Sequence, residues 1–97
     1  MVKIGKKEKN GALYKAILEL KNEEDCYDFF QDLCTVSELR SMEQRFEVAK
    51  LLYQGMKYND ILDRTGASSA TISRVNRSLV GGTGTYDKIF GNMGEVD

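Results

Sequence analysis

The sequence lacks several residue types on which common kinds of protein chemistry depend. Its 97 residues include no His, no Pro and no Trp, and only two Cys. Without His, and with so few thiols, the usual ligands of a zinc site and the usual base of a nucleophilic mechanism are missing. We find no paired carboxylates and no phosphate-cradling glycine loop that could replace them. We therefore expect neither a metal site nor an enzyme.

Cys26 and Cys34 are eight residues apart in one predicted helical region. At 1.5 Å per residue, this separation is about 12 Å along a helix axis, which is too long for a disulfide within the chain. Two buried thiols are the expected state.

The sequence also lacks an excess of charge of either sign, because its formal net charge is only −1. This value argues against a simple basic protein that coats nucleic acid. The charges are nevertheless segregated, with a basic stretch at residues 1–10, an acidic one at 19–32, and positive charge again at Arg74 and Arg77. No apolar run has the length of a membrane span and no signal peptide is apparent, so we expect a cytoplasmic protein without a membrane partner.

Apolar residues recur at spacings of three and four through most of the chain, which indicates an all-α fold. The pattern predicts a single helical domain at residues 11–91, a flexible basic tail at 1–10 and a frayed C-terminus at 92–97. A chain of this size has a marginal core of its own, so a dimer is expected before a monomer.

Three helices are predicted before Gly55. The first ends near residues 21–22, and Asn22 caps the second. Thr35 and Glu38 fit a capping box at the start of the third helix. That third helix is apolar on more than one side, which predicts burial on two sides, in the core or across a dimer interface.

Residues 57–79 have the pattern of a helix-turn-helix. A short helix runs to Thr65, a turn follows at Gly66 and Ala67, and Ser68 caps a second helix that ends near residue 80. The apolar residues of the second helix fall at helical spacing and are expected to pack on the first. They are Ile72, Val75 and Leu79, facing Ile61 and Leu62.

The remaining faces of the second helix carry small and polar residues that suit a DNA groove. Hydroxyl groups can donate to phosphates or bases, an alanine methyl can contact thymine, and arginine can reach guanine or phosphate. The residues expected to contact DNA are Lys57, Ser68, Ser69, Ala70, Thr71, Ser73, Arg74 and Arg77. On spacing alone, a helical hairpin that only packs into a core remains the alternative.

Residues 44–52 (QRFEVAKLL), Gly55 and residues 65–74 (TGASSATISR) resemble the tryptophan repressor (TrpR) family, and within it the branch of the YerC/YecD type. The resemblance implies six helices per subunit and an intertwined homodimer with two reading heads. Such a dimer would bind double-stranded DNA at a near-palindromic operator with half-sites roughly 34 Å apart. The resemblance thus predicts a sequence-specific transcriptional regulator, most simply a repressor. A competing hypothesis is a dimeric protein-protein interaction module whose helix-turn-helix only packs.

The same resemblance implies an effector pocket. Arg45 and Arg74 match the two arginines that sandwich the indole of tryptophan in the Trp repressor, and Thr35 matches a threonine that holds the polar end of the ligand. The residue after the second arginine is Gly in the tryptophan-binding member and Val75 in this chain. Because a branched side chain could plug the pocket, we expect no cofactor and disfavour tryptophan as co-repressor. Arg45 would then pair with an acidic residue such as Glu38 or Glu43, or bind phosphate.

Overall fold

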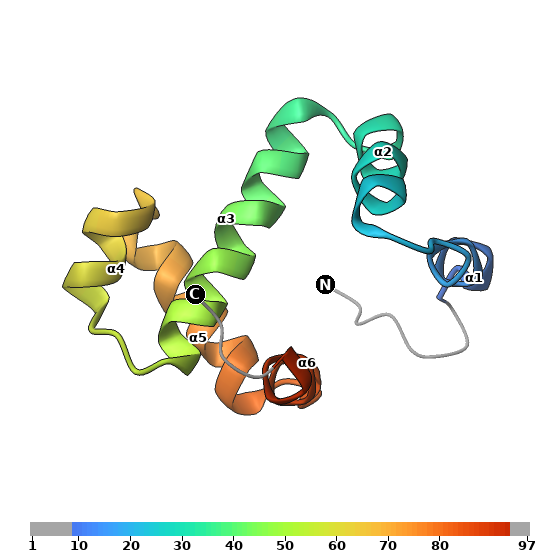
Figure 1. Cartoon of the computed structure of the whole chain (residues 1–97). Helices are drawn as coiled ribbons and strands as arrows, with labels where there is room; N and C mark the ends of the chain where they lie inside the picture. Colours follow the sequence, from blue (N-terminus) through green and yellow to red (C-terminus); the bar gives the residue numbers. More distant parts are fainter. Residues whose placement is uncertain (1–8, 94–97) are drawn as a thin grey trace. The chain divides into compact units, whose positions relative to one another are not determined.

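A computed structural model of the chain describes residues 9–93. Over this range it contains six helices and no strand, as the sequence predicts (Figure 1). The helices are α1 (Gly11–Ile17), α2 (Glu23–Leu33), α3 (Val36–Tyr53), α4 (Tyr58–Thr65), α5 (Ser69–Gly81) and α6 (Thr85–Met93).

The chain divides into two compact units, an N-terminal one up to Val36 and a C-terminal one from Ser37. The N-terminal unit contains α1 and α2, and the C-terminal unit contains α4 to α6 and nearly all of α3. The prediction of a single domain over residues 11–91 did not anticipate this division.

The structure adds detail at the two ends of the predicted domain. Most of the basic tail predicted at 1–10 lies outside the described residues, but Asn10 belongs to the fold. Its side chain accepts hydrogen bonds from the backbone N–H groups of Ala12 and Leu13, at 3.1 and 3.4 Å, and so caps α1. At the other end, α6 continues to Met93, so the chain is helical at residues 92 and 93, where fraying was predicted.

Helix starts that depend on a capping side chain were predicted correctly. The Asn22 side chain accepts a hydrogen bond from the Asp25 N–H at 2.8 Å, and the Ser68 hydroxyl accepts one from the Thr71 N–H at 3.1 Å. Each bond satisfies a backbone donor that the first turn of a helix leaves free. The end of α1 was predicted less well, because the helix stops at Ile17, several residues before the expected boundary.

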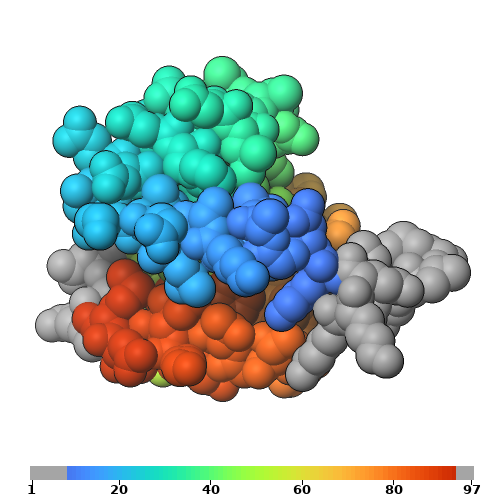
Figure 2. Space-filling view, turned by 90° about the vertical axis from the view of Figure 1, so that its right-hand side faces the viewer, coloured from blue at the N-terminus to red at the C-terminus, as the bar shows by residue number. Residues whose placement is uncertain are grey.

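The helices of the N-terminal unit bury no side chain completely. Leu18 is 82% exposed and Leu33 is 54% exposed, while Phe29 and Phe30 are half-buried and stack edge to face with ring centroids 5.3 Å apart. The atoms of both helices, blue to cyan, can be seen in the space-filling view (Figure 2). Each helix therefore has an apolar face that the chain by itself leaves partly in water.

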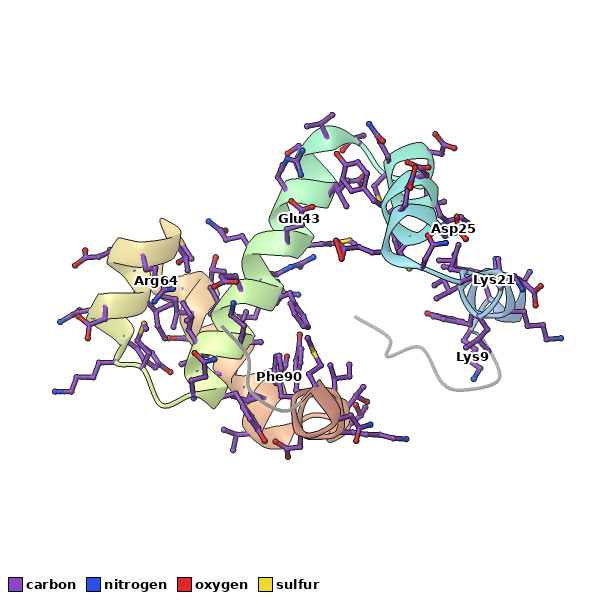
Figure 3. The ribbon with its side chains drawn as sticks, viewed as in Figure 1. Lys9, Lys21, Asp25, Glu43, Arg64 and Phe90 are labelled. Atoms are coloured by element: carbon purple, nitrogen blue, oxygen red, sulfur yellow. The ribbon has the colours of Figure 1, made fainter. Side chains whose placement is uncertain are left out.

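The C-terminal unit has a true core, in which α4 and α5 lie against the C-terminal half of α3 (Figure 1). Its buried residues are Val48, Ala49, Leu51, Ile61, Ala67, Ile72, Val75 and Phe90. Phe90 points from α6 toward α3, where its ring centroid lies 5.3 Å from that of Phe46 and 5.0 Å from that of Tyr53 (Figure 3). Phe46 and Tyr53 nevertheless remain 38% and 44% exposed, so within one chain α3 is fully buried on one side only.

Candidate nucleic-acid interface

The turn between α4 and α5 determines how the two helices pack. Gly66 adopts a left-handed conformation with φ of 73°, and its N–H donates to the Leu62 carbonyl at 2.9 Å. This geometry ends α4 and reverses the chain within a few residues, which a residue with a Cβ does only under strain. Ala67 follows at 2% exposure, and α5 begins after Ser68.

Packing between the two helices confirms the predicted helix-turn-helix, with one exception. Ile61 and Ile72 are fully buried and Val75 is 5% exposed, so these three form the contact as expected. Leu79 is half-buried. Leu62 is the exception, because 41% of it is exposed and it does not belong to the buried cluster.

The residues predicted to contact DNA are gathered on α5 and at the start of α4. Ser69, Ala70, Arg74 and Arg77 are exposed, whereas Thr71 and Ser73 are half-buried. Because no bulky side chain stands on the first turn of α5, the end of this helix can approach base edges closely. Lys57 lies at the N-cap of α4, where its side chain is exposed and makes no capping hydrogen bond.

Ser68 and Thr71 form a small hydrogen-bonded unit at the start of α5. The Ser68 hydroxyl accepts the Thr71 N–H and donates its own proton to Thr71 Oγ1, each across 3.1 Å. A phosphate oxygen only accepts hydrogen bonds, so Ser68 cannot donate to one without releasing Thr71. Thr71 keeps its own proton for a ligand, so this geometry favours Thr71 over Ser68 as the donor to DNA.

A second hydrogen-bonded group, which the sequence analysis missed, connects α3 to the turn. Gln44 Nε2 donates to the Thr65 carbonyl oxygen at 3.2 Å. The Thr65 hydroxyl donates to the Ile61 carbonyl at 2.7 Å and accepts the Ala67 N–H at 3.1 Å. Gln44 and Thr65 are 21 residues apart, and no local pattern indicates such a contact.

The two arginines of the predicted effector pocket do line one cavity, of about 440 Å³. Its walls are made by Met42, Arg45, Phe46, Arg74, Val75, Ser78 and Tyr86. Val75 forms part of the wall of this cavity. Whether its side chain excludes an indole stays a prediction. The contribution of Tyr86 was not foreseen, because it depends on how α6 folds back. Thr35 lies in the N-terminal unit, and its part in the pocket stays a prediction.

Arg45 does not use Glu43 as an ion-pair partner. Glu43 Oε1 lies 2.6 Å from Arg40 Nη1, in a pair three residues apart on the exposed side of α3. Arg45 therefore lines the cavity together with Arg74, and the Glu43 carboxylate pairs with Arg40 instead.

Two kinds of site are not found in the part of the chain that the structure describes. No group of three or more His, Cys, Asp or Glu side chains there is arranged to hold a metal ion. Among the helices of residues 9–93, none has both the length and the apolar character needed to cross a bilayer.

The two helices α4 and α5 are joined by a tight turn at a glycine, and the second helix is capped and exposes small and cationic residues. These features define a helix-turn-helix protein. More narrowly, the chain belongs to the Trp repressor protein family, whose model matches residues 8–93. Members of this family are DNA-binding regulators, not enzymes. The predicted family is thereby confirmed.

Individual relatives agree with this assignment. The uncharacterized protein YerC of Bacillus subtilis (strain 168) is 47% identical over 85 residues, which cover 88% of this chain and 82% of YerC. The crystal structure of a TrpR-like protein from Eubacterium eligens ATCC 27750 superposes with a TM-score of 0.88 at 50% identity, covering 96% of this chain and 99% of the other. A Staphylococcus aureus structure gives a TM-score of 0.84 at 50% identity over 90% of both chains.

Proposed function

We propose that this protein is a sequence-specific transcriptional regulator, a repressor in its simplest form, that binds a near-palindromic operator as a homodimer. The observation that carries the proposal is the start of α5. There, Ser69 and Ala70 are exposed, and a capping bond at Ser68 holds the helix end in shape. A rigid helix end with small side chains is what entry into a major groove requires.

The side chains around this helix end divide into two roles. Lys57, Arg74 and Arg77 supply positive charge, and we assign Lys57 to the phosphate backbone beside the groove. Ser69, Ala70, Thr71 and Ser73 are the residues that read base edges or bind nearby phosphates. A net charge of −1 is compatible with this role, because these cations are gathered around one helix pair.

The homodimer is supported by the incomplete burial of the N-terminal unit. Neither α1 nor α2 buries a side chain, and Leu18 and Val36 are 82% and 72% exposed. An apolar face of this kind is stabilised when a second copy covers it. On α3, the aromatic side chains of Phe46 and Tyr53 are also partly exposed to water. A second copy that covers them would extend the same interface.

We further propose that operator binding does not require tryptophan. Val75 occupies the wall between the helices where the tryptophan-binding member of the family has Gly, and it is only 5% exposed. A valine at this place narrows the space beside the guanidinium of Arg74 in which an indole would lie. The cavity of about 440 Å³ is lined by Arg45 and Arg74, so a different effector with a negative charge would suit it better.

The decisive experiment is enrichment of random DNA duplexes on the purified protein, with and without tryptophan. We expect one palindromic motif with the same half-site spacing in both cases, and affinity that falls steeply with added salt as counterions are released. An R74A/R77A variant should no longer bind the DNA duplex but should still form a dimer. A variant that removes the same charge elsewhere, R40A/K88A, should keep binding.

Absence of binding to any duplex at low salt would reject the regulator. The dimeric interaction module whose helix-turn-helix only packs would then be the better hypothesis. Enrichment of a motif only in the presence of tryptophan would instead reject the tryptophan-independent mechanism and leave DNA binding intact.

A further inference from the structure

The carboxamide of Gln44 supplies a polar link between α3 and the turn of the helix-turn-helix. Its Nε2 donates to the carbonyl oxygen of Thr65, the last residue of α4. The final carbonyl groups of an α-helix have no partner within the helix. At this helix end the Leu62 carbonyl is satisfied by the Gly66 N–H, and the Thr65 carbonyl by Gln44.

Apolar contacts also hold the pair against α3. Val48, Ala49 and Leu51 of α3 belong to the same buried cluster as Ile61, Ala67 and Ile72. Burial of apolar surface supplies most of the stabilising free energy but has little directional preference. A hydrogen bond has a preferred distance and angle, so it restricts how α4 and the turn rotate on α3.

The position of Gln44 makes this restriction relevant to α5. Thr65, which accepts the bond, lies four residues before the first residue of α5, and its hydroxyl also accepts the Ala67 N–H. Gln44 is half-buried, which shields the bond from water. A change at Gln44 is therefore passed through two linked hydrogen bonds to the segment that starts the reading helix.

We propose that Gln44 is a positioning residue for DNA recognition, which fixes the orientation of α5 relative to α3 and thereby the half-site spacing that the dimer accepts. The inference rests on the proposed function, since spacing has meaning only for a two-headed DNA-binding dimer. It assigns no DNA contact to Gln44. Instead, Gln44 determines how strongly the dimer prefers operators with the favoured half-site spacing over operators with other spacings.

The test compares wild type with Q44M and Q44E. Methionine keeps the length of the side chain and removes the donor, while glutamate keeps the shape and replaces the donor by an acceptor. Q31M, the same change at an exposed position of α2, is the matched control. The measured quantity is the ratio of affinities for the preferred operator and for operators lengthened or shortened by one base pair.

We expect both Gln44 variants to lower this ratio about three- to tenfold, the range that follows from losing one hydrogen bond, and Q31M to leave it unchanged. A variant that is merely less stable would weaken binding to all operators by the same factor. Equal weakening across spacings, or an unchanged ratio, would overturn the proposal.

Amide hydrogen exchange without DNA provides the second readout. We expect the Gly66 and Ala67 amides to exchange faster in both Gln44 variants, while the amides of Val48 and Leu51 keep their wild-type rates. Unchanged exchange at the turn would overturn the proposal even if wild type binds DNA. Failure of wild type to bind any duplex would instead remove the proposed function, and the recognition role of Gln44 with it.

Discussion

The hydroxyl of Ser68 donates to the hydroxyl of Thr71 across 3.1 Å and accepts the backbone N–H of the same residue. Two hydroxyl groups that look interchangeable in the sequence therefore have different tasks. Ser68 caps α5 and orients Thr71, and Thr71 has the proton that is free to reach DNA. Four changes test this division and other features of the structure.

Replacement of Ser68 by Ala removes both the cap and the orientation of Thr71. We expect a loss of about 1 kcal/mol in the free energy of unfolding, the usual effect of deleting a serine cap. Affinity for the operator should fall as well. Because the two hydroxyls act as one unit, S68A/T71V should bind DNA about as weakly as T71V alone. Additive losses would show that Ser68 contacts DNA itself, and S69A, with no cap to lose, controls for stability.

Replacement of Val75 by Gly enlarges the cavity and removes a buried side chain. We expect a destabilisation of about 2 kcal/mol, from lost burial together with the poor helix propensity of glycine. V80G is the matched control, since Val80 is on the same helix at 79% exposure and should cost only about 0.5 kcal/mol. Thermal unfolding with tryptophan should show stabilisation of V75G and none of wild type. Equal stabilisation of both proteins would contradict the proposed loss of tryptophan dependence.

Replacement of Gly66 by Ala tests the left-handed turn. Its φ of 73° is unfavourable for any residue with a Cβ, so we expect G66A to lose about 1–2 kcal/mol, although no neighbouring atom would meet the added methyl group. G91A should instead increase the free energy of unfolding, because Gly91 is helical in α6 with open space around it. Alanine stabilises a helix relative to glycine by about 0.5–1 kcal/mol. Chemical denaturation of the two variants measures both values, and a neutral G66A would rule out strain at this turn.

Replacement of Leu18 by Lys tests the dimer. Leu18 is 82% exposed in the single chain, so the change should hardly affect an isolated subunit. If a second copy covers this face, burial of the charge opposes association, and we expect L18K to sediment as a lighter species at low protein concentration. N59K, at an exposed position of α4, adds the same charge and should sediment as wild type. Identical sedimentation of all three proteins would exclude Leu18 from the interface.

Local features of the fold were predictable from the sequence because their physical causes are local. Asn22 and Ser68 each cap a helix through a backbone group three residues away, and the turn at Gly66 depends on the φ of Gly66 itself. The periodicity that placed Ile61, Ile72 and Val75 at the helix contact depends only on the geometry of a helix. Such features require no knowledge of the rest of the chain.

Features that involve distant segments could not be predicted in this way. The bond from Gln44 to Thr65 joins residues 21 apart, and nothing in the neighbourhood of either residue indicates it. Spacing along the sequence treats Leu62 and Ile61 alike, yet Ile61 is fully buried and Leu62 is 41% exposed. The open cavity beside Val75 depends on the placement of Tyr86 of α6, which spacing along α5 does not specify.

The short length of α1 has a consequence for how the protein folds. A helix of seven residues is too short to persist in water, and α1 has no fully buried residue to hold it. If a second copy supplies the missing contacts, the last step of folding is an encounter between two chains. Its rate then increases with protein concentration, so a newly made subunit remains open to proteolysis at α1 and α2 until it meets a partner. Refolding from denaturant should accordingly contain a slow phase that accelerates as more protein is added.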